Sequence, residues 1–260
     1  MISEAICGAG ASPGELQDQQ LERLPYNSFF TSLIVYHDVD SRSAALNMAI
    51  DEALLEFATV PSIRFYQWDH PALSFGYFGK FEDVANYRRD IVRRWTGGGV
   101  VFHGEDLTYS VVIPSSDLAF SESSMSIYEK VHRAVCFALH AYGQAAELVT
   151  VAALYERRPA VDSAVTDRRY NKDSCFANPI RADVLSNGRK VAGAAQRRIR
   201  SGLLQQGSIQ NVDFGNGFTD SFARALCCEC CEKPLDDALL ARAEQIATQK
   251  YATPAWLRRR

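Results

Sequence analysis

The amino-acid sequence predicts an α+β fold in which mainly antiparallel sheets are flanked by helices. Short segments rich in β-forming residues occur together with longer segments whose apolar residues recur every three or four positions. Several of the short segments are joined by tight turns, which favours hairpins. Neither an internal repeat nor a linker divides the chain. We therefore expect one domain over residues 29–260, after a loosely ordered extension over residues 1–28 that is rich in small and polar residues.

Composition and charge argue against several classes of protein. The 260 residues carry a formal net charge of −3, whereas a nucleic-acid-binding domain is usually basic. The N-terminus lacks the basic and apolar regions of a secretory signal, and no run approaches the ~18 apolar residues of a membrane-spanning helix. We therefore expect a cytoplasmic protein without a nucleic-acid or membrane partner. Seven cysteines in such a chain suggest reduced thiols rather than disulfides.

The first third of the chain is predicted to contain a strand, a helix and three further strands. Residues 33–36 form a short apolar strand, and Asp40 or Ser41 is expected to cap the helix that follows. The apolar face of this helix is formed by Leu46, Ile50, Ala53, Leu54 and Phe57. The next strands are expected over residues 63–68, 72–76 and 92–95.

The middle of the chain is predicted to contain a glycine loop, a hairpin and a long helix. Residues 96–99 form the loop, and a short turn at residues 104–106 joins strands over residues 100–103 and 107–114. A turn this short makes a hairpin the expected connection. A helix follows over residues 126–142, with Gly143 just after its C-terminus. A strand over residues 147–151 and a polar loop with a short helix over residues 155–174 complete this part.

The last third is predicted to begin with a three-stranded meander. Residues 182–186 and 189–193 flank Asn187-Gly188, a strong hairpin signal, and residues 203–210 supply the third strand. The remainder, over residues 219–250, is expected to be mostly helical. It includes Cys227, Cys228, Cys230 and Cys231, which we interpret as small residues of a helix. A metal site is the alternative, but no second Cys or His pair stands at zinc-site spacing.

The first segment with chemical potential is RRWTGGGVVFH, over residues 93–103. Three consecutive glycines let the backbone approach a ligand closely and turn its N–H groups toward a carbonyl oxygen or a phosphate. Arg93 and Arg94 add positive charge beside this loop. A tight connection between strands, with the arginines in salt bridges, would explain the same residues without a ligand.

The second such segment is GRKVAGAAQRR, over residues 188–198. The small residues at 192–195 make a thin strand, which leaves room above it for a slender ligand or for another backbone. Lys190 at its start could hold an acyl carbonyl or a phosphate as a point charge. A solvated lysine at the end of a strand is the alternative.

The third is the polar stretch DSCFAN, over residues 173–178, which contains Cys175. A reactive thiolate requires a nearby cation or dipole that lowers its pKa, and Lys172, Lys190 and His103 are candidates. An unreactive cysteine in a loop is the alternative.

Together these segments resemble the superfamily of lipoate–protein ligase A and the octanoyltransferases. The similarity extends from about residue 31 to the end and also includes LNMAIDEAL at residues 46–54, LTYS at 107–110 and YATPAW at 251–256. The resemblance implies a fold like the catalytic domains of biotin and lipoate ligases. It also implies a narrow channel for an octanoyl or lipoyl chain between the glycine loop and the thin strand.

The resemblance further implies roles for individual residues, closest to those of the cysteine-dependent octanoyltransferases. Cys175 matches the nucleophile of that group, and Lys190 matches the lysine that contacts the acyl carbonyl. Substrate binding is expected to involve Arg93, Arg94, Thr96, Gly97, Gly98, Gly99, His103, Gly193, Ala194 and Gln196. The implied reaction moves octanoyl, or lipoyl, from acyl carrier protein through a cysteine thioester to a lysine of a lipoyl-domain or glycine-cleavage carrier protein. No cofactor or metal is expected.

Three alternatives remain open from the sequence. An ATP-dependent lipoate ligase would use the same loop and lysine on an acyl-adenylate and would require ATP and Mg²⁺. An amidotransferase would move octanoyl between two carrier domains with Cys175 and Lys190. A non-catalytic relative would bind carrier proteins without turnover.

Overall fold

The computed structural model describes residues 28–150 and 179–259, and the two sheets of this part of the chain are mainly antiparallel. The larger sheet has the strand order β11-β1-β2-β6-β10-β9-β8-β7. Its strands are β1 (Leu33–His37), β2 (Ser62–Tyr66), β6 (Leu107–Pro114), β7 (Glu147–Leu148), β8 (Val184–Ser186), β9 (Arg189–Ile199), β10 (Gly202–Ile209) and β11 (Cys230–Glu232). The smaller sheet consists of β3 (Ala72–Phe75), β4 (Asp90–Arg93) and β5 (Val101–His103), with β3 in the centre. Parallel pairing occurs where β1 meets β2 and β11 and where β3 meets β4. The predicted fold class is confirmed.

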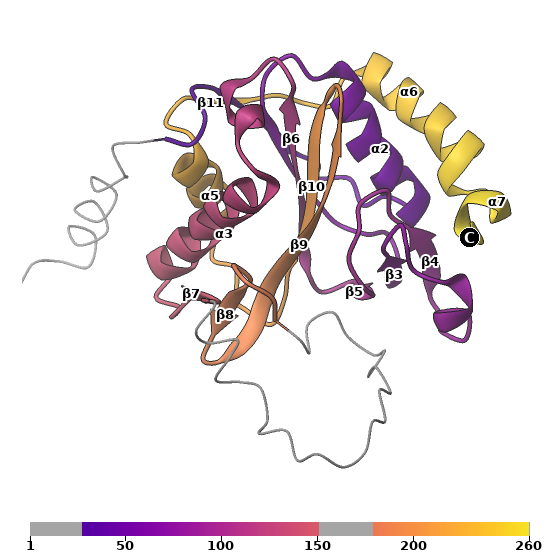
Figure 1. Ribbon diagram of the computed structural model, residues 1–260, viewed down its shortest axis with the longest axis horizontal. Helices are drawn as coiled ribbons and strands as arrows, with labels where there is room; N and C mark the ends of the chain where they lie inside the picture. Colours follow the sequence, from indigo (N-terminus) through magenta and orange to yellow (C-terminus); the bar gives the residue numbers. More distant parts are fainter. Residues whose placement is uncertain (1–27, 151–178, 260) are drawn as a thin grey trace, which may run out of the picture.

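Helices cover both faces of the larger sheet (Figure 1). On one side lie α3 (Ser124–Ala141) and α5 (Phe218–Leu226), and on the other lie α2 (Ala44–Phe57) and α6 (Asp237–Ile246). A π-helical turn (Ala247–Tyr251) leads from α6 to the short helix α7 (Pro254–Leu257), and two 3₁₀ turns span Phe81–Asp83 and Leu118–Ser121. No helix within residues 28–150 and 179–259 is long and apolar enough to cross a membrane.

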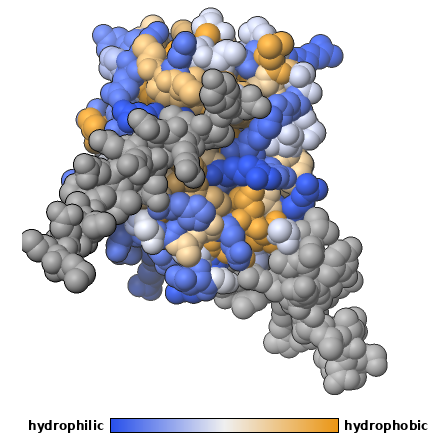
Figure 2. Space-filling model, turned by 90° about the vertical axis from the view of Figure 1, so that its left-hand side faces the viewer, coloured by the Kyte–Doolittle hydropathy of each residue, from blue (hydrophilic) through white to orange (hydrophobic). Residues whose placement is uncertain are grey.

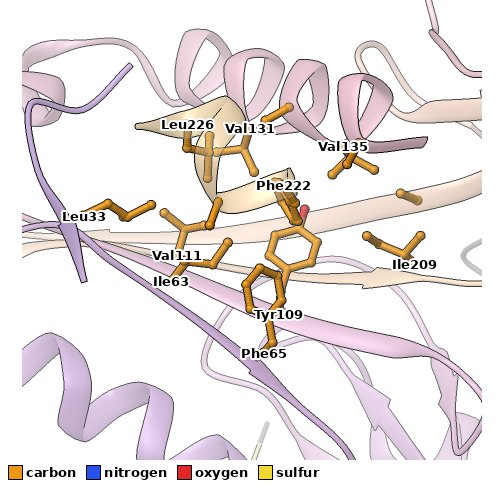
Figure 3. Packing of buried hydrophobic residues seen from close by; sticks show 14 of the residues in the cluster. Leu33, Ile63, Phe65, Tyr109, Val111, Val131, Val135, Ile209, Phe222 and Leu226 are labelled. Carbon is orange, nitrogen blue, oxygen red and sulfur yellow. The ribbon is translucent and has the colours of Figure 1, made fainter. Parts of the chain in front are cut away.

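The larger core lies between the sheet and the α3–α5 layer (Figure 3). Phe65 and Tyr109 come from neighbouring strands, and both rings meet Phe222 of α5 edge-on, with ring centroids 5.6 and 5.1 Å apart. Val131 and Val135 of α3 are fully buried in the same cluster. The outer surface of this side mixes hydrophilic and hydrophobic side chains (Figure 2), as expected for helices that bury one face only.

A second core lies between the sheet and α2, where Ile50, Ala53 and Leu54 are buried as the apolar spacing predicts. Phe57 is half exposed at the end of the helix and does not belong to this core. The helix begins later than predicted, because Ser43, not Asp40 or Ser41, is the N-cap and its side chain accepts a hydrogen bond from Leu46 N.

The predicted hairpin between residues 100–103 and 107–114 is wrong. β5 pairs with β3 in the small sheet, whereas β6 pairs with β2 and β10 in the large one. The chain changes sheets at Gly104, whose φ of +142° falls in the range that favours glycine. The N–H group of Gly104 donates to the side chain of Asp106, so the turn is fixed by a side chain rather than by strand pairing.

The predicted helical position of the cysteine cluster is also wrong. α5 ends at Leu226, and Cys230–Glu232 form the edge strand β11, parallel to β1. Cys227 is buried, whereas Cys228, Cys230 and Cys231 are exposed. None of the four belongs to the two groups of possible metal ligands found among the described residues.

The meander in the last third is confirmed. β8, β9 and β10 are consecutive antiparallel neighbours, and Asn187 and Gly188 have φ angles of +49° and +74° in the turn between β8 and β9. Positive φ at both central residues is the requirement of the tight hairpin turn that Asn-Gly favours. This hairpin brings Lys190 next to the buried end of β8.

Candidate active site

A narrow cavity of about 50 Å³ lies between the glycine loop and β9, where the sequence predicts a channel. Its walls include Gly98 on the loop side, and Gly193 and Ala195 on the strand side. Further lining residues are Met48, Tyr66, Trp68, Ser74, Arg94, Val101, His103, Thr108, Lys190, Ala194, Gln206, Gly207 and Ser208. This volume is below the roughly 300–1,000 Å³ that ligand sites commonly have.

Both walls of this cavity carry small residues that lie close to their neighbours. A Cβ atom on Gly193 would lie 2.6 Å from Cε and 2.7 Å from Nζ of Lys190, so the lysine side chain crosses directly over this glycine. On the opposite wall Gly98 has φ +84°, and a Cβ there would lie 3.3 Å from the Cβ of Ala195. The glycine loop and the thin strand therefore approach to van der Waals contact.

Lys190 forms a buried ion pair with Asp183. The distance from Lys190 Nζ to Asp183 Oδ2 is 2.8 Å, and the two side chains are 6% and 0% exposed. The same carboxylate oxygen accepts from Ile180 N at 2.7 Å, and Oδ1 accepts from the hydroxyl of Tyr128 at 2.6 Å. A buried charge pair is stabilised when its remaining hydrogen-bonding positions are filled, and both carboxylate oxygens of Asp183 accept such further bonds. The pair therefore fixes the ammonium group at the cavity.

Two residues of α3 hold the segment that carries Asp183. The Tyr128 hydroxyl also accepts from Ala194 N at 3.0 Å, which links the carboxylate to the thin strand. One turn later, His132 Nδ1 lies 2.6 Å from the carbonyl oxygen of Ala182, a non-glycine residue with φ +65°. His132 Nε2 lies 3.1 Å from the hydroxyl of Tyr109. These contacts hold Ala182 in a conformation that non-glycine residues rarely adopt.

The stability of the protein is expected to fall as the pH is lowered from about 6.5 to about 4. Burial lowers the pKa of His132 to about 4, so the folded chain stays unprotonated there while the unfolded chain takes up a proton near pH 6.5. The free energy of unfolding should decrease by on the order of 3 kcal/mol over this range, as measured by urea denaturation at pH 7 and pH 4. A His132→Gln variant should be less stable at pH 7 and lose less on acidification. His140→Gln, at an exposed site, is the control and should lose as much unfolding free energy on acidification as the parent protein. If His132→Gln also lost as much as the parent, the assignment to His132 would be contradicted.

The glycine loop is held from below by Arg94. Its Nη2 atom donates to the carbonyl oxygens of Gly97 and Gly99, at 3.0 and 2.8 Å, and its Nη1 atom donates to Ser74 Oγ at 2.6 Å. Gly76 lies under the same loop, where a Cβ would be 2.0 Å from the carbonyl oxygen of Gly98. The loop carbonyls are therefore directed into the protein, which the sequence pattern alone did not predict.

A Gly76→Ala substitution is expected to destabilise the protein by about 1–3 kcal/mol, because the new methyl group would collide with rigid backbone. Urea denaturation measures this change. Gly97→Ala is the matched control within the loop, since a Cβ on Gly97 would meet nothing within 4 Å. Equal unfolding free energies for the two variants would contradict the close approach of the loop to Gly76.

His103 is buried below the loop with both ring nitrogens engaged. Nδ1 lies 2.8 Å from Asp106 Oδ2, and Nε2 lies 2.6 Å from Ser74 Oγ. Trp68 stacks on the imidazole with ring centroids 4.0 Å apart. Burial lowers the pKa of His103 from its usual value, although Asp106 acts in the opposite direction.

The inner end of the cavity is polar and fully hydrogen-bonded. Thr96, one of the predicted substrate contacts, donates to Gln206 Oε1 at 2.8 Å, and Gln206 Nε2 donates to Asp51 Oδ2 at 2.7 Å. Asp51 also accepts from Arg64 Nη1 and from the Tyr66 hydroxyl. Thr96 thus lies behind the lining residue Gln206 and supports it.

Two of the predicted substrate contacts, Arg93 and Gln196, do not line the cavity. Arg93 is 1% exposed, and its guanidinium donates to five backbone carbonyls, those of Tyr77, Gly79, Trp256, Leu257 and Arg259. It therefore anchors the C-terminal segment and does not line the cavity. Gln196 donates to Gln205 Oε1 at 2.7 Å and is not among the lining residues either. Cys175 lies outside the described residues.

A larger cleft of about 1190 Å³ adjoins the narrow cavity and shares Trp68 and His103 with it. Its other walls come from the turn around Gly104–Asp106, from the β8–β9 turn at Asn187 and from residues 210–213.

Comparison with known proteins gives a consistent set of matches. The model of the lipoyl protein ligase A/B catalytic domain matches residues 43–230. A protein of Brevibacillus brevis named octanoyltransferase LipM is 30% identical, over 86% of this chain and 98% of that relative. The protein of the same name from Geobacillus kaustophilus is 35% identical over 64% of this chain and 60% of the relative.

Solved structures of lipoate–protein ligases share the fold. Lipoate–protein ligase A bound with ATP has a TM-score of 0.65 at 19% identity, over 88% of this chain and 98% of that one. A putative lipoate protein ligase of Thermoplasma acidophilum with bound lipoic acid has a TM-score of 0.63 at 20% identity, over 87% of this chain and 98% of the other.

Proposed function

Because the chain belongs to the lipoyl protein ligase A/B catalytic-domain family, we propose that it is an octanoyltransferase of lipoate attachment. The observation that carries this proposal is Lys190, which Asp183 holds over Gly193 in the wall of the narrow cavity. Relatives named octanoyltransferase align with most of the chain and support the choice of reaction. Residues 29–260 would form the single catalytic domain, and a cytoplasmic location remains a prediction.

In the first proposed step, the thiolate of Cys175 attacks the thioester carbonyl of octanoyl-acyl carrier protein. A new C–S bond to Cys175 forms, the bond to the carrier's thiol breaks, and the released thiolate takes up a proton. The Lys190 ammonium stabilises the negative charge that develops on the carbonyl oxygen. Its ion pair with Asp183 keeps it in place, so little reorganisation is needed during the reaction.

In the second step, the neutral ε-amine of a lysine on the acceptor attacks the Cys175 thioester. The amide bond forms, the C–S bond to Cys175 breaks, the attacking nitrogen releases its proton to solvent, and the Cys175 thiolate is regenerated. Lys190 again faces the charged oxygen. The acceptor would be a lipoyl domain or a glycine-cleavage carrier protein, and no cofactor takes part.

Covalent geometry is compatible with the role given to Cys175. Ile180 follows Cys175 by five positions, and its N–H group donates to the Asp183 carboxylate that pairs with Lys190. An extended chain spans at most about 3.3–3.6 Å per residue, so the two Cα atoms can be no more than about 18 Å apart. The chain therefore limits how far the Cα atom of Cys175 can lie from Ile180, whatever the conformation between them.

The proposal is tested by mixing the protein with octanoyl-acyl carrier protein and an apo-lipoyl domain in the absence of ATP. An octanoyl mass shift on the acceptor lysine is the expected result. Modification of the acceptor only when free lipoate, ATP and Mg²⁺ are supplied would identify a ligase instead. Binding of carrier proteins without modification under either condition would indicate a non-catalytic relative.

A further inference from the structure

We infer that Asp106, His103 and Ser74 form a hydrogen-bonded relay that positions Arg94 and, through it, the glycine loop over the acyl channel. The inference rests on the proposed function, since it assigns positioning residues to that reaction. The relay is continuous: Asp106 Oδ2 is 2.8 Å from His103 Nδ1, and His103 Nε2 is 2.6 Å from Ser74 Oγ. Arg94 then connects Ser74 Oγ, at 2.6 Å, with the carbonyls of Gly97 and Gly99.

The direction of every hydrogen bond in the relay follows from its two ends. An ionised Asp106 only accepts, so the ring proton of a neutral His103 lies on Nδ1 and faces the carboxylate, and Nε2 is left as an acceptor. A guanidinium only donates, so Ser74 Oγ accepts from Arg94, and the Ser74 hydroxyl donates to His103 Nε2. Asp106 Oδ2 also accepts from the hydroxyls of Thr108 and Ser208, which suits an ionised carboxylate. The relay thus requires a neutral His103 in one tautomer.

The spacing of these three side chains is that of a Ser-His-Asp catalytic triad, but the surroundings favour positioning over nucleophilic attack. Ser74 is 0% exposed, and its oxygen already accepts from the Arg94 guanidinium. Trp68 packs flat on the His103 ring and prevents its rotation. Each member is therefore held on more than one side, as expected for a rigid support.

The relay determines how the loop presents its peptide groups. One guanidinium nitrogen, Arg94 Nη2, binds the carbonyls on both sides of Gly98, whose φ is +84°. In a trans peptide the N–H group points opposite to the preceding C=O, so Arg94 also sets the N–H directions of Gly98 and Val100. A misplacement of about 1 Å in such groups can reduce a rate on the order of 10²-fold.

Protonation of His103 would disturb the relay, because Nε2 would then donate to Ser74 Oγ, reversing this hydrogen bond, and would place a second cation beside Arg94. The charged groups that face His103 are Asp106, Arg94 and Arg89, and Arg89 donates to its backbone carbonyl. Burial lowers the pKa of His103, opposed by Asp106 and assisted by the two arginines. The relay should therefore persist at neutral pH and fail only on the acid side of the usual histidine pKa of about 6.5.

The test measures acyl-enzyme formation from octanoyl-acyl carrier protein by the full-length protein and four variants. Ser74→Ala and His103→Asn should lower kcat on the order of 10²-fold with little change in KM. His103→Gln should recover part of the loss, because its amide oxygen can reach the former position of Nε2 and accept from Ser74. The rate of His103→Gln should also not show the decrease at acid pH that is expected for the parent protein. His140→Asn, on the exposed end of α3, is the control and should match the parent.

A second measurement tests the relay independently of activity. Nitrogen NMR of ¹⁵N-histidine-labelled protein at pH 7 should show His103 as a neutral imidazole protonated on Nδ1, and Ser74→Ala should shift its Nε2 resonance. The opposite tautomer, or a doubly protonated ring, would overturn the relay whether or not the protein is active. Parental kinetics in Ser74→Ala and His103→Asn, or an octanoyl adduct on Ser74 in a Cys175→Ala background, would also overturn it. Failure of the parent protein to form any adduct would instead overturn the proposed function.

Discussion

Cys175→Ala is expected to abolish octanoyl transfer to the acceptor, with a loss on the order of 10³-fold or more, because the proposed thioester forms on the sulfur that this substitution removes. The variant should keep the stability of the parent protein and still bind the octanoyl donor. The measurement is the rate of octanoylation of an apo-lipoyl domain, followed by mass spectrometry with purified donor. Circular dichroism melting establishes that the variant is folded.

Cys228→Ala is the matched control for this experiment. Cys228 is an exposed free thiol whose sulfur lies 2.8 Å from the hydroxyl of Ser28, on the opposite edge of the large sheet from the β7–β8 strands. Its replacement should leave the transfer rate unchanged. If Cys175→Ala transferred octanoyl at the parental rate, the covalent mechanism would be ruled out. Direct attack of the acceptor lysine on the donor thioester would then be favoured.

Lys190→Met is expected to lower the rate of acyl-enzyme formation by about 10²–10³-fold, the range found when one group that stabilises an oxyanion is removed. The ammonium lies at the cavity with 6% of the side chain exposed, so water cannot readily replace it. If Lys190 also favours the Cys175 thiolate, the pH at which the rate is half-maximal should move up toward the ordinary cysteine pKa of about 8.5. Stopped-flow or quenched mass measurements over pH 6–9 give both quantities.

Three further variants separate the charge of Lys190 from its placement. Lys190→Arg should retain folding and part of the rate. Asp183→Asn keeps an acceptor for Tyr128 but weakens the hold on Lys190, so an intermediate rate is expected. Lys130→Met removes a half-exposed lysine paired with Glu122 and should match the parent. Parental rates in Lys190→Met would contradict the role of this lysine in the reaction.

Local signals in the sequence predicted those parts of the fold that depend on neighbouring residues. Asn187-Gly188 is an example, because its two positive φ angles determine the register of β8 and β9. The turn at Gly104–Asp106 shows the limit of such reasoning. A short turn normally implies a hairpin, but the partner of β5 is β3 and the partners of β6 are β2 and β10, and these pairings depend on residues far away in the chain.

The candidate site likewise contains residues that sequence motifs predict and residues that depend on distant partners. The glycine loop, the thin strand and Lys190 were predicted from motifs, and the structure brings Gly98, Lys190 and Gly193 together at one cavity. Asp183 was not predicted as a site residue, although a carboxylate between Ala182 and Val184, just before the apolar strand β8, is a usable signal. Tyr128 and Ser74 had no comparable signal, because their partners lie 55 and 29 residues away.

Arg93 and Arg94 illustrate why adjacent residues of one motif can differ in role. Arg93 is the last residue of β4 and Arg94 follows it directly, and successive side chains of an extended chain point to opposite sides, so only one of the pair faces the loop. Arg94 takes that position, and Arg93 is directed to the carbonyls of the C-terminal segment, where Trp256 Nε1 in turn donates to its carbonyl oxygen. The motif therefore joins the glycine loop to the end of the chain.

The most direct test of the central claim is the intact mass of the protein after mixing with octanoyl-acyl carrier protein without ATP or acceptor. The covalent mechanism predicts a single octanoyl adduct that maps to Cys175 and disappears when an apo-lipoyl domain is added. An unmodified protein under these conditions, together with octanoylation or lipoylation of the acceptor only in the presence of the free acid, ATP and Mg²⁺, would contradict it.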